Sequence, residues 1–235
     1  MNVCTPTGFS GLGTALGLSQ LTGVSPYFPL LALAVSVRWF HYCHLNHSFL
    51  FITSNWFMLL IAILAIANFF LDKILGANSI WHAIHVGISP VIGGVITVAT
   101  AQNVIPGISM QAPAAPLSMA DMAMHLSLLS IASGGLHLTG TVSVVVLFIV
   151  GAFLAGIAQF HRFIGRGITN IFHLATAGIS NVIVSLIEDV VVCIGVLLSF
   201  FTPVLMLIVV IIVTLLLLST FRTLGKGTGF LFGRR

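Results

Sequence analysis

Apolar residues fill most of the chain in long runs, and short stretches of glycine, proline, serine or charged residues separate these runs. Most of the runs are long enough for a helix to cross the hydrocarbon core of a bilayer, which takes about twenty residues. The alternation of apolar and polar residues typical of a membrane barrel does not occur in the sequence. The pattern therefore predicts an all-α, polytopic membrane protein with about six transmembrane helices.

Two of the predicted membrane segments contain breaks. The segments are expected at about residues 9–40, 56–71, 80–101, 119–159 and 171–190, with a sixth that ends near residue 218. The first is interrupted by glycine and proline at residues 23–26 and again at Pro29, and the fourth by two glycines at 134–135. The sequence leaves open whether the broken segments cross the membrane or re-enter it, and whether Thr202-Pro203 marks a kink or a turn.

The two halves of the chain resemble each other. LGLSQLTGVSPYFPLLALAV in the first half corresponds to LSIASGGLHLTGTVSVVVLF in the second, and each half then has a span that leads to acidic residues. We predict one membrane domain, residues 1–235, made of two repeats at 8–104 and 118–222. With three spans each, the repeats would be inverted relative to each other, as in many transporters.

Composition supports the membrane class, and charge sets an orientation. The chain is 58% hydrophobic and 5% charged, too apolar for the surface of a soluble domain. Half of the basic residues lie in the tail 222–235, and others follow alternate predicted spans. We therefore expect both termini in the cytoplasm and no nucleic-acid partner. The expected partners are the lipid bilayer and either other membrane subunits or further copies of this chain.

Acidic residues between apolar flanks are the first candidates for function. Glu188 and Asp189 follow Asn181 and Ser185 at helical spacing, so a helix would present the four as one polar stripe. An ionised acid near the bilayer centre costs roughly 2.5–3.5 kcal/mol, which calls for a partner or a water-filled route. Alternatively, the chain breaks here and both acids cap the sixth helix. The candidate residues for a pathway or for charge pairs are Asn181, Ser185, Glu188, Asp189, Asp72, Lys73, Arg162 and Arg166.

Histidines form two groups that could carry a metal or haem. His82 and His85 lie three residues apart on one predicted helical face. A denser group after the first segment, in FHYCHLNH, has side chains that suit zinc or copper: His41, Cys43, His44 and His47. Histidines at a membrane interface also commonly serve as polar contacts, and this alternative stays open. No other cofactor is predicted.

Motifs of known enzymes do not occur in the chain. The sequence contains no serine–histidine–acid spacing, no paired-histidine zincin motif and no kinase signature. The three cysteines are scattered without a C-x-x-C pair, so they predict no disulfide framework. We expect no enzymatic activity from this chain.

Several motifs together resemble a known family. They are GVSPYFPLLAL in the first segment, Asp72-Lys73, Pro90-x-x-Gly93, His161-Arg-x-x-x-Arg166 and, most specifically, Ser185-Leu-Ile-Glu188-Asp189-Val. The chain is similar over nearly its whole length to the bacterial membrane family catalogued as domain of unknown function 4126. The resemblance implies a location in the bacterial cytoplasmic (inner) membrane and leaves the activity open. Asn68 and Leu75 depart from the acid and the proline that family members usually carry there.

Three functions fit the sequence. The leading hypothesis is a small transporter or channel in which the two broken segments meet near the centre and the polar candidates line the route. The alternative is a non-catalytic accessory subunit of a larger respiratory or photosynthetic membrane complex, because apolar faces suit packing against partner helices. The third is a metal or haem carrier that uses the histidines.

Overall fold

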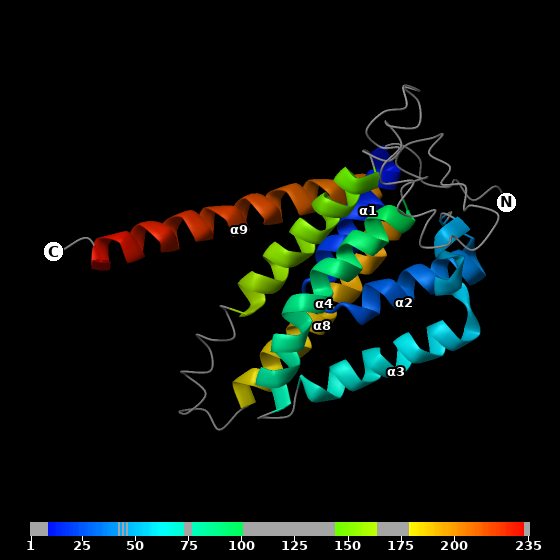
Figure 1. The fold of residues 1–235 in the computed structure, drawn as a ribbon, viewed down its shortest axis with the longest axis horizontal. Helices are drawn as coiled ribbons and strands as arrows, with labels where there is room; N and C mark the ends of the chain where they lie inside the picture. Colours follow the sequence, from blue (N-terminus) through cyan, green and yellow to red (C-terminus); the bar gives the residue numbers. More distant parts are fainter. Residues whose placement is uncertain are drawn as a thin grey trace, which may run out of the picture.

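The computed structural model describes residues 9–41, 43, 45, 47–72, 77–100, 144–163 and 179–232, and for residues 9, 47, 77–83, 179–181 and 224–232 the backbone alone. These residues form helices and their connections, with no strand among them (Figure 1). In order they are α1 (Phe9–Leu21), α2 (Tyr27–Val35), the π-helical η1 (Ser36–Phe40), the 3-10 helix η2 (His47–Thr53), α3 (Asn55–Leu71), α4 (Ala77–Ala99), an unlabelled helix Val144–Phe163, α8 (Ile179–Phe201) and α9 (Pro203–Phe232). The predicted all-α class is confirmed.

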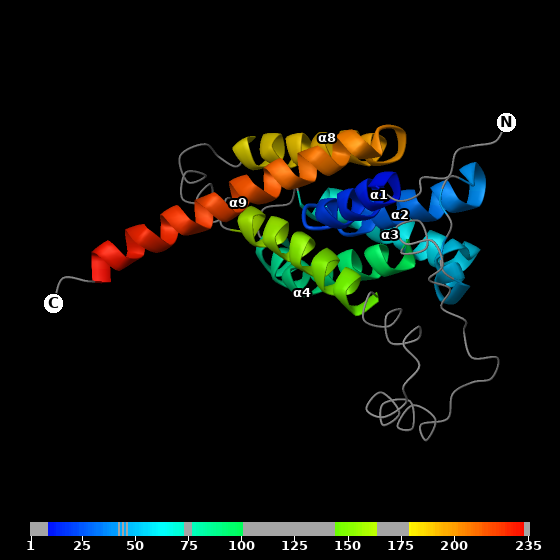
Figure 2. The ribbon, with the colours of Figure 1, turned by 90° about the horizontal axis from the view of Figure 1, so that it is seen from above.

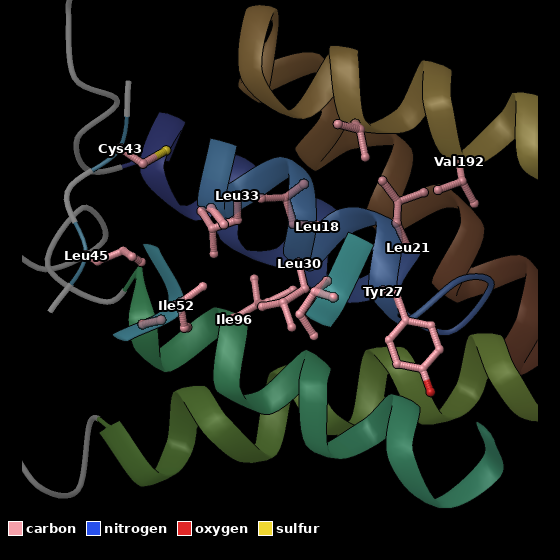
Figure 3. Packing of buried hydrophobic residues seen from close by; sticks show 14 of the residues in the cluster. Leu18, Leu21, Tyr27, Leu30, Leu33, Cys43, Leu45, Ile52, Ile96 and Val192 are labelled. Carbon is pink, nitrogen blue, oxygen red and sulfur yellow. The ribbon is translucent and has the colours of Figure 1, made fainter. Parts of the chain in front are cut away.

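The first apolar segment is a helical hairpin. α1 ends at Leu21, and α2 starts at Tyr27 and runs back in the opposite direction (Figure 3). Pro26 has no backbone N–H for a continuing helix and restricts Ser25 before it, so the chain breaks here. The interruption predicted at residues 23–26 is confirmed, and the segment turns back at this break. The further interruption predicted at Pro29 is wrong, because Pro29 lies in the first turn of α2, where its missing N–H costs no helical hydrogen bond.

Small residues let α1 pack closely in the middle of the bundle, where it contacts α4, α8 and α9 (Figure 2). A Cβ atom added at Gly13 would overlap the carbonyl oxygen of Pro203, at the start of α9. Side-chain hydrogen bonds fix the position of α1 further. Thr14 Oγ1 donates to the Ser199 carbonyl of α8 at 2.8 Å, and Ser19 Oγ to the Gly151 carbonyl at 2.8 Å. Small and hydroxylated residues of this kind are typical of helix contacts inside membranes.

α8 and α9 form a second reversal of the chain, at Thr202 (Figures 1 and 2). Pro203 is the first residue of α9, a position where its missing N–H costs no helical hydrogen bond. Of the two interpretations of Thr202-Pro203, the turn between helices is therefore correct. Glu188 and Asp189 lie within α8, so the alternative in which they cap the start of a sixth helix is wrong.

Three of the described helices are long and apolar enough to cross a membrane: Val144–Phe163, Val182–Phe201 and Pro203–Thr223. Shorter apolar helices lie at Tyr27–Phe40, Asn55–Leu71 and Ile84–Ala99. α1 begins at one end of the bundle, and α9 ends beyond the opposite end (Figure 1). Six spans with both termini on one side are therefore not confirmed.

The predicted inverted repeat also stays a prediction. The repeat would also pair Ser89-Pro90-Val91 of the first half with Thr202-Pro203-Val204 of the second. These prolines have different structural roles, because Pro90 lies inside α4 whereas Pro203 begins α9. The break expected at residues 134–135 lies outside the described residues.

Apolar side chains form both the core and most of the outer surface. The core contains Leu18, Leu30, Leu33, Ile96 and Val192, contributed by α1, α2, α4 and α8 (Figure 3). Large apolar side chains on α3, α8 and α9 face outward, among them Ile63, Ile187, Ile211 and Leu215. An outer surface of this kind suits contact with lipid.

The close packing of α1 predicts the effect of a single methyl group. We expect Gly13→Ala to lower stability by roughly 1–3 kcal/mol, because the new Cβ would overlap the Pro203 carbonyl. Gly87→Ala in α4 is the matched control, because nothing lies within 4 Å of a Cβ built there. Thermal unfolding in detergent measures both, and equal stability of the two variants would contradict this packing.

Candidate functional site

Residues 22–26, the hairpin tip, connect α1 and α2 and lie against the helix Val144–Phe163. A side chain at Gly23 would collide with the Ala155 carbonyl and the Ala158 methyl group, so glycine permits this approach. Thr22 Oγ1 bonds back to the Ser19 carbonyl at 2.6 Å and completes the last turn of α1. The tip therefore brings irregular backbone into the interior of the bundle.

Arg162 joins the hairpin tip to two acidic residues. Its Nη1 donates a hydrogen bond to the Val24 carbonyl oxygen. Its Nη2 lies 2.6 Å from Asp72 Oδ2, directly after α3, and its Nε donates to Glu188 Oε2 of α8 at 2.8 Å. The side chains of Arg162, Asp72 and Glu188 are 5%, 2% and 20% exposed. One guanidinium thus connects the tip, α3 and α8.

The electrostatic setting of Arg162 explains why a buried cation is tolerated. Two carboxylates offset the loss of hydration, as a buried charge requires. The Val24 carbonyl lies just beyond the C-terminal end of α1, where the helix dipole favours positive charge. Because all three nitrogens of the guanidinium are bonded, its orientation is fixed by direct contacts.

α3 and α4 add further polar contacts around the tip. Asn68 Nδ2 of α3 donates to Ser25 Oγ at 3.4 Å. The Ser89 carbonyl of α4 accepts from Thr22 Oγ1 at 3.3 Å. One turn earlier on α4, the imidazole of His85 packs edge-on against the Tyr27 ring, with 5.5 Å between the ring centroids. Three tip residues, Thr22, Val24 and Ser25, and the adjacent Tyr27 therefore contact polar side chains or backbone.

The polar side chains around the tip follow one spacing rule. Each surrounding helix provides a pair three or four residues apart, so that both members lie on the same face. These eight residues, the polar shell, are Asn68 and Asp72, His85 and Ser89, Gln159 and Arg162, and Ser185 and Glu188. All but Glu188 are buried.

Three members of the polar shell have no hydrogen-bond partner for their side chains among the residues that the structure describes. They are Ser89, Gln159 and Ser185. Gln159 is 1% exposed, and both serines are 0% exposed. Buried hydroxyl and amide groups normally bond to protein or ordered water. The polar shell therefore has hydrogen-bonding capacity that the described protein groups do not use.

The structure brings together part of the residue set predicted from the sequence. Asp72, Arg162 and Glu188 form one ion-paired cluster, and Ser185 lies one turn before Glu188 on α8. Asp189 is half-buried on the same helix. Lys73 and Arg166 lie outside the described residues, as does the side chain of Asn181, so their predicted roles stay predictions.

The predicted metal ligands do not meet in the described part of the chain, where no group of three His, Cys, Asp or Glu side chains could hold a metal ion. His85 belongs to the polar shell, His41 is exposed, and Cys43 is buried. Burial raises the pKa of the Cys43 thiol to about 12, which opposes the thiolate that metals bind. His44 and the side chains of His47 and His82 lie outside the described part, so metal or haem binding stays a prediction.

Sequence reasoning missed four contributors to the site, which are Asn68, Ser89 and Gln159 of the polar shell and the Val24 carbonyl. Gln159 stands alone in an apolar run, and its only signal is its position three residues before Arg162. The Val24 carbonyl is a backbone group, which no residue type can indicate. A search for polar residues at helical spacing from each candidate charge would have found Gln159, but it could not have found Val24.

Removal of the central charge predicts a large loss of stability. We expect Arg162→Met to cost about 3–5 kcal/mol, because both carboxylates lose their bonded cation. Adding Asp72→Asn and Glu188→Gln to this variant should recover part of the loss, because neutral groups are easier to bury. Thermal unfolding in detergent compares the variants. A triple variant less stable than Arg162→Met would contradict the ion-paired cluster.

Comparison with known proteins identifies the family. The model of a domain of unknown function, DUF4126, matches residues 12–133 and 119–223, which together cover most of the chain. No curated protein and no solved structure matches it. The resemblance inferred from the motifs is thus confirmed, and the chain belongs to the DUF4126 family.

Proposed function

We propose that this protein is a small multi-pass channel or transporter of a bacterial inner membrane, with a route that passes the hairpin tip. The observation that carries the proposal is the buried Arg162, which bonds the tip backbone and two carboxylates at once. Ionisable residues inside membrane segments are costly, and they commonly mark substrate or ion pathways.

The depth of the tip supports a route at this point. α1 has 13 residues, so it is about 20 Å long, shorter than the hydrocarbon core of about 30 Å. If α1 starts near one face, the tip ends inside the membrane. Irregular backbone at that depth is tolerated where protein buries it or where it lines a water-filled cavity. Ends of broken helices form the binding sites of many transporters.

The unequal exposure of the acids suggests how such a route would be controlled. Glu188 is the most exposed member of the ion-paired cluster, and Asp72 is almost fully buried. Glu188 can therefore exchange contacts more easily than Asp72 can. In this proposal Asp72 anchors Arg162, and the Glu188 contact opens and closes beside the tip.

Two halves matched by one family model also fit a transporter built of repeats. The matched stretches, residues 12–133 and 119–223, divide the chain close to the boundary proposed between the repeats 8–104 and 118–222. Internal duplication is common among transporters that bind their substrate between two repeats. The duplication is part of this proposal, but the proposal rests on the contacts of Arg162.

One observation favours the second candidate, an accessory subunit. α9 has 30 residues, and its C-terminal part extends beyond the other described helices (Figures 1 and 2). Such a helix could pack against another membrane protein. This candidate requires other chains in native mass analysis of the gently extracted protein, whereas a lone monomer or a homo-oligomer favours the channel or transporter.

The proposed route predicts a flux that depends on Glu188. We expect Glu188→Gln to change the flux of the permeant at least several-fold, because it removes one charge that holds Arg162 at the tip. Proteoliposome measurements of ion conductance and of osmotic solute entry give the flux. Ser219→Ala is the control, because that exposed hydroxyl bonds only within α9, to Leu216.

Two outcomes would contradict this proposal. One is that wild-type protein passes neither ions nor small solutes. The other is that Glu188→Gln leaves a measurable flux unchanged, as Ser219→Ala is expected to do. Either result would indicate that the ion-paired cluster has a structural role alone.

A further inference from the structure

The three unpartnered side chains of the polar shell belong to three helices that contact the hairpin tip or Arg162 beside it. The Ser89 carbonyl bonds Thr22 Oγ1, and the Gln159 backbone nitrogen lies against Gly23. Ser185 lies one turn from Glu188, which bonds Arg162. Each of three helices, α4, Val144–Phe163 and α8, therefore carries one unpartnered polar side chain. In each helix this residue, or one a single turn away, contacts the hairpin tip or Arg162.

The chemistry of these side chains defines what they can bind. Two hydroxyl groups and one amide are all uncharged, and each can both donate and accept a hydrogen bond. Each is at least nine-tenths buried, so leaving it without a partner is unfavourable. A molecule that both donates and accepts hydrogen bonds would satisfy all three.

The charges of the site disfavour an ionic ligand. Arg162 is already paired with two carboxylates, Asp72 and Glu188, so the cluster has more negative than positive charge and repels an anion. A cation would compete with Arg162 itself for Asp72 or Glu188. An uncharged molecule can bond the unpartnered groups and leave these contacts in place.

We propose that the polar shell binds small uncharged molecules that form hydrogen bonds, of which water is the smallest, and that these are what the protein passes. The proposal rests on the proposed function and names its class of permeant. Ser89, Gln159 and Ser185 bond the permeant, while the Arg162 cluster holds the tip and discourages ions.

The wild-type protein tests the class directly. Proteoliposomes and empty vesicles are compared by stopped-flow light scattering with water, urea and glycerol, and by electrical conductance with potassium chloride. The expected result is faster passage of at least one neutral molecule without ionic conductance. Ionic conductance without neutral passage overturns the inference and keeps the proposed function. No passage of either kind overturns both.

Matched glutamine variants test the residues. Gln159→Leu should lower neutral permeability by roughly five- to tenfold, as expected when one hydrogen bond to the permeant is lost. The unfolding temperature of this variant should be at least that of wild type, because the Gln159 amide has no hydrogen bond to a described residue that the substitution could remove. Gln20→Leu is the control, because the Gln20 amide already bonds Thr214 of α9 and is not among the unpartnered groups.

A second substitution covers the case in which Gln159→Leu fails to fold. Ser89→Ala removes one hydroxyl and little volume, and the same fall in permeability is expected. If the folded Gln159→Leu or Ser89→Ala protein passes neutral molecules as fast as wild type, these side chains do not bond the permeant and the inference is wrong.

Discussion

The buried guanidinium of Arg162 is the interaction on which the arrangement of this molecule depends. It bonds a carbonyl of the hairpin tip, a carboxylate after α3 and a carboxylate within α8. A charge at this depth is costly in a membrane protein unless it is compensated. The same contacts that compensate it also hold the hairpin tip against the bundle, so electrostatics and fold are coupled at one residue.

This coupling explains why the polar residues are concentrated. The outer faces of α3, α8 and α9 are apolar, as contact with lipid requires. The polar shell instead lies on the inner faces, at helical spacing around the tip. A purely structural charge cluster would need Arg162 and its partners alone. The additional uncharged groups, Ser89, Gln159 and Ser185, are what favour a binding role.

Local features of the sequence predicted most of the helices. Glycine and proline at residues 23–26 mark the break, and α3 and α4 begin and end within a few residues of the predicted bounds. The need of Asp72 and Glu188 for a basic partner could also be predicted. The sequence offered Lys73, Arg162 and Arg166 as that partner. It could not single out Arg162, because Arg162 lies 90 residues from Asp72 and 26 residues from Glu188 along the chain. The reversal of α2 depends on packing against α3, which no local pattern contains.

The accessibility of the hairpin tip to water tests the central claim most directly. In a cysteine-free protein in its membrane, Ser25→Cys is exposed to a small water-soluble thiol reagent, with Ala15→Cys in the middle of α1 as the control. A tip beside a hydrated route predicts that the cysteine at position 25 reacts and that the one at position 15 does not. Equal protection of both from either face of the membrane would contradict a route at the tip.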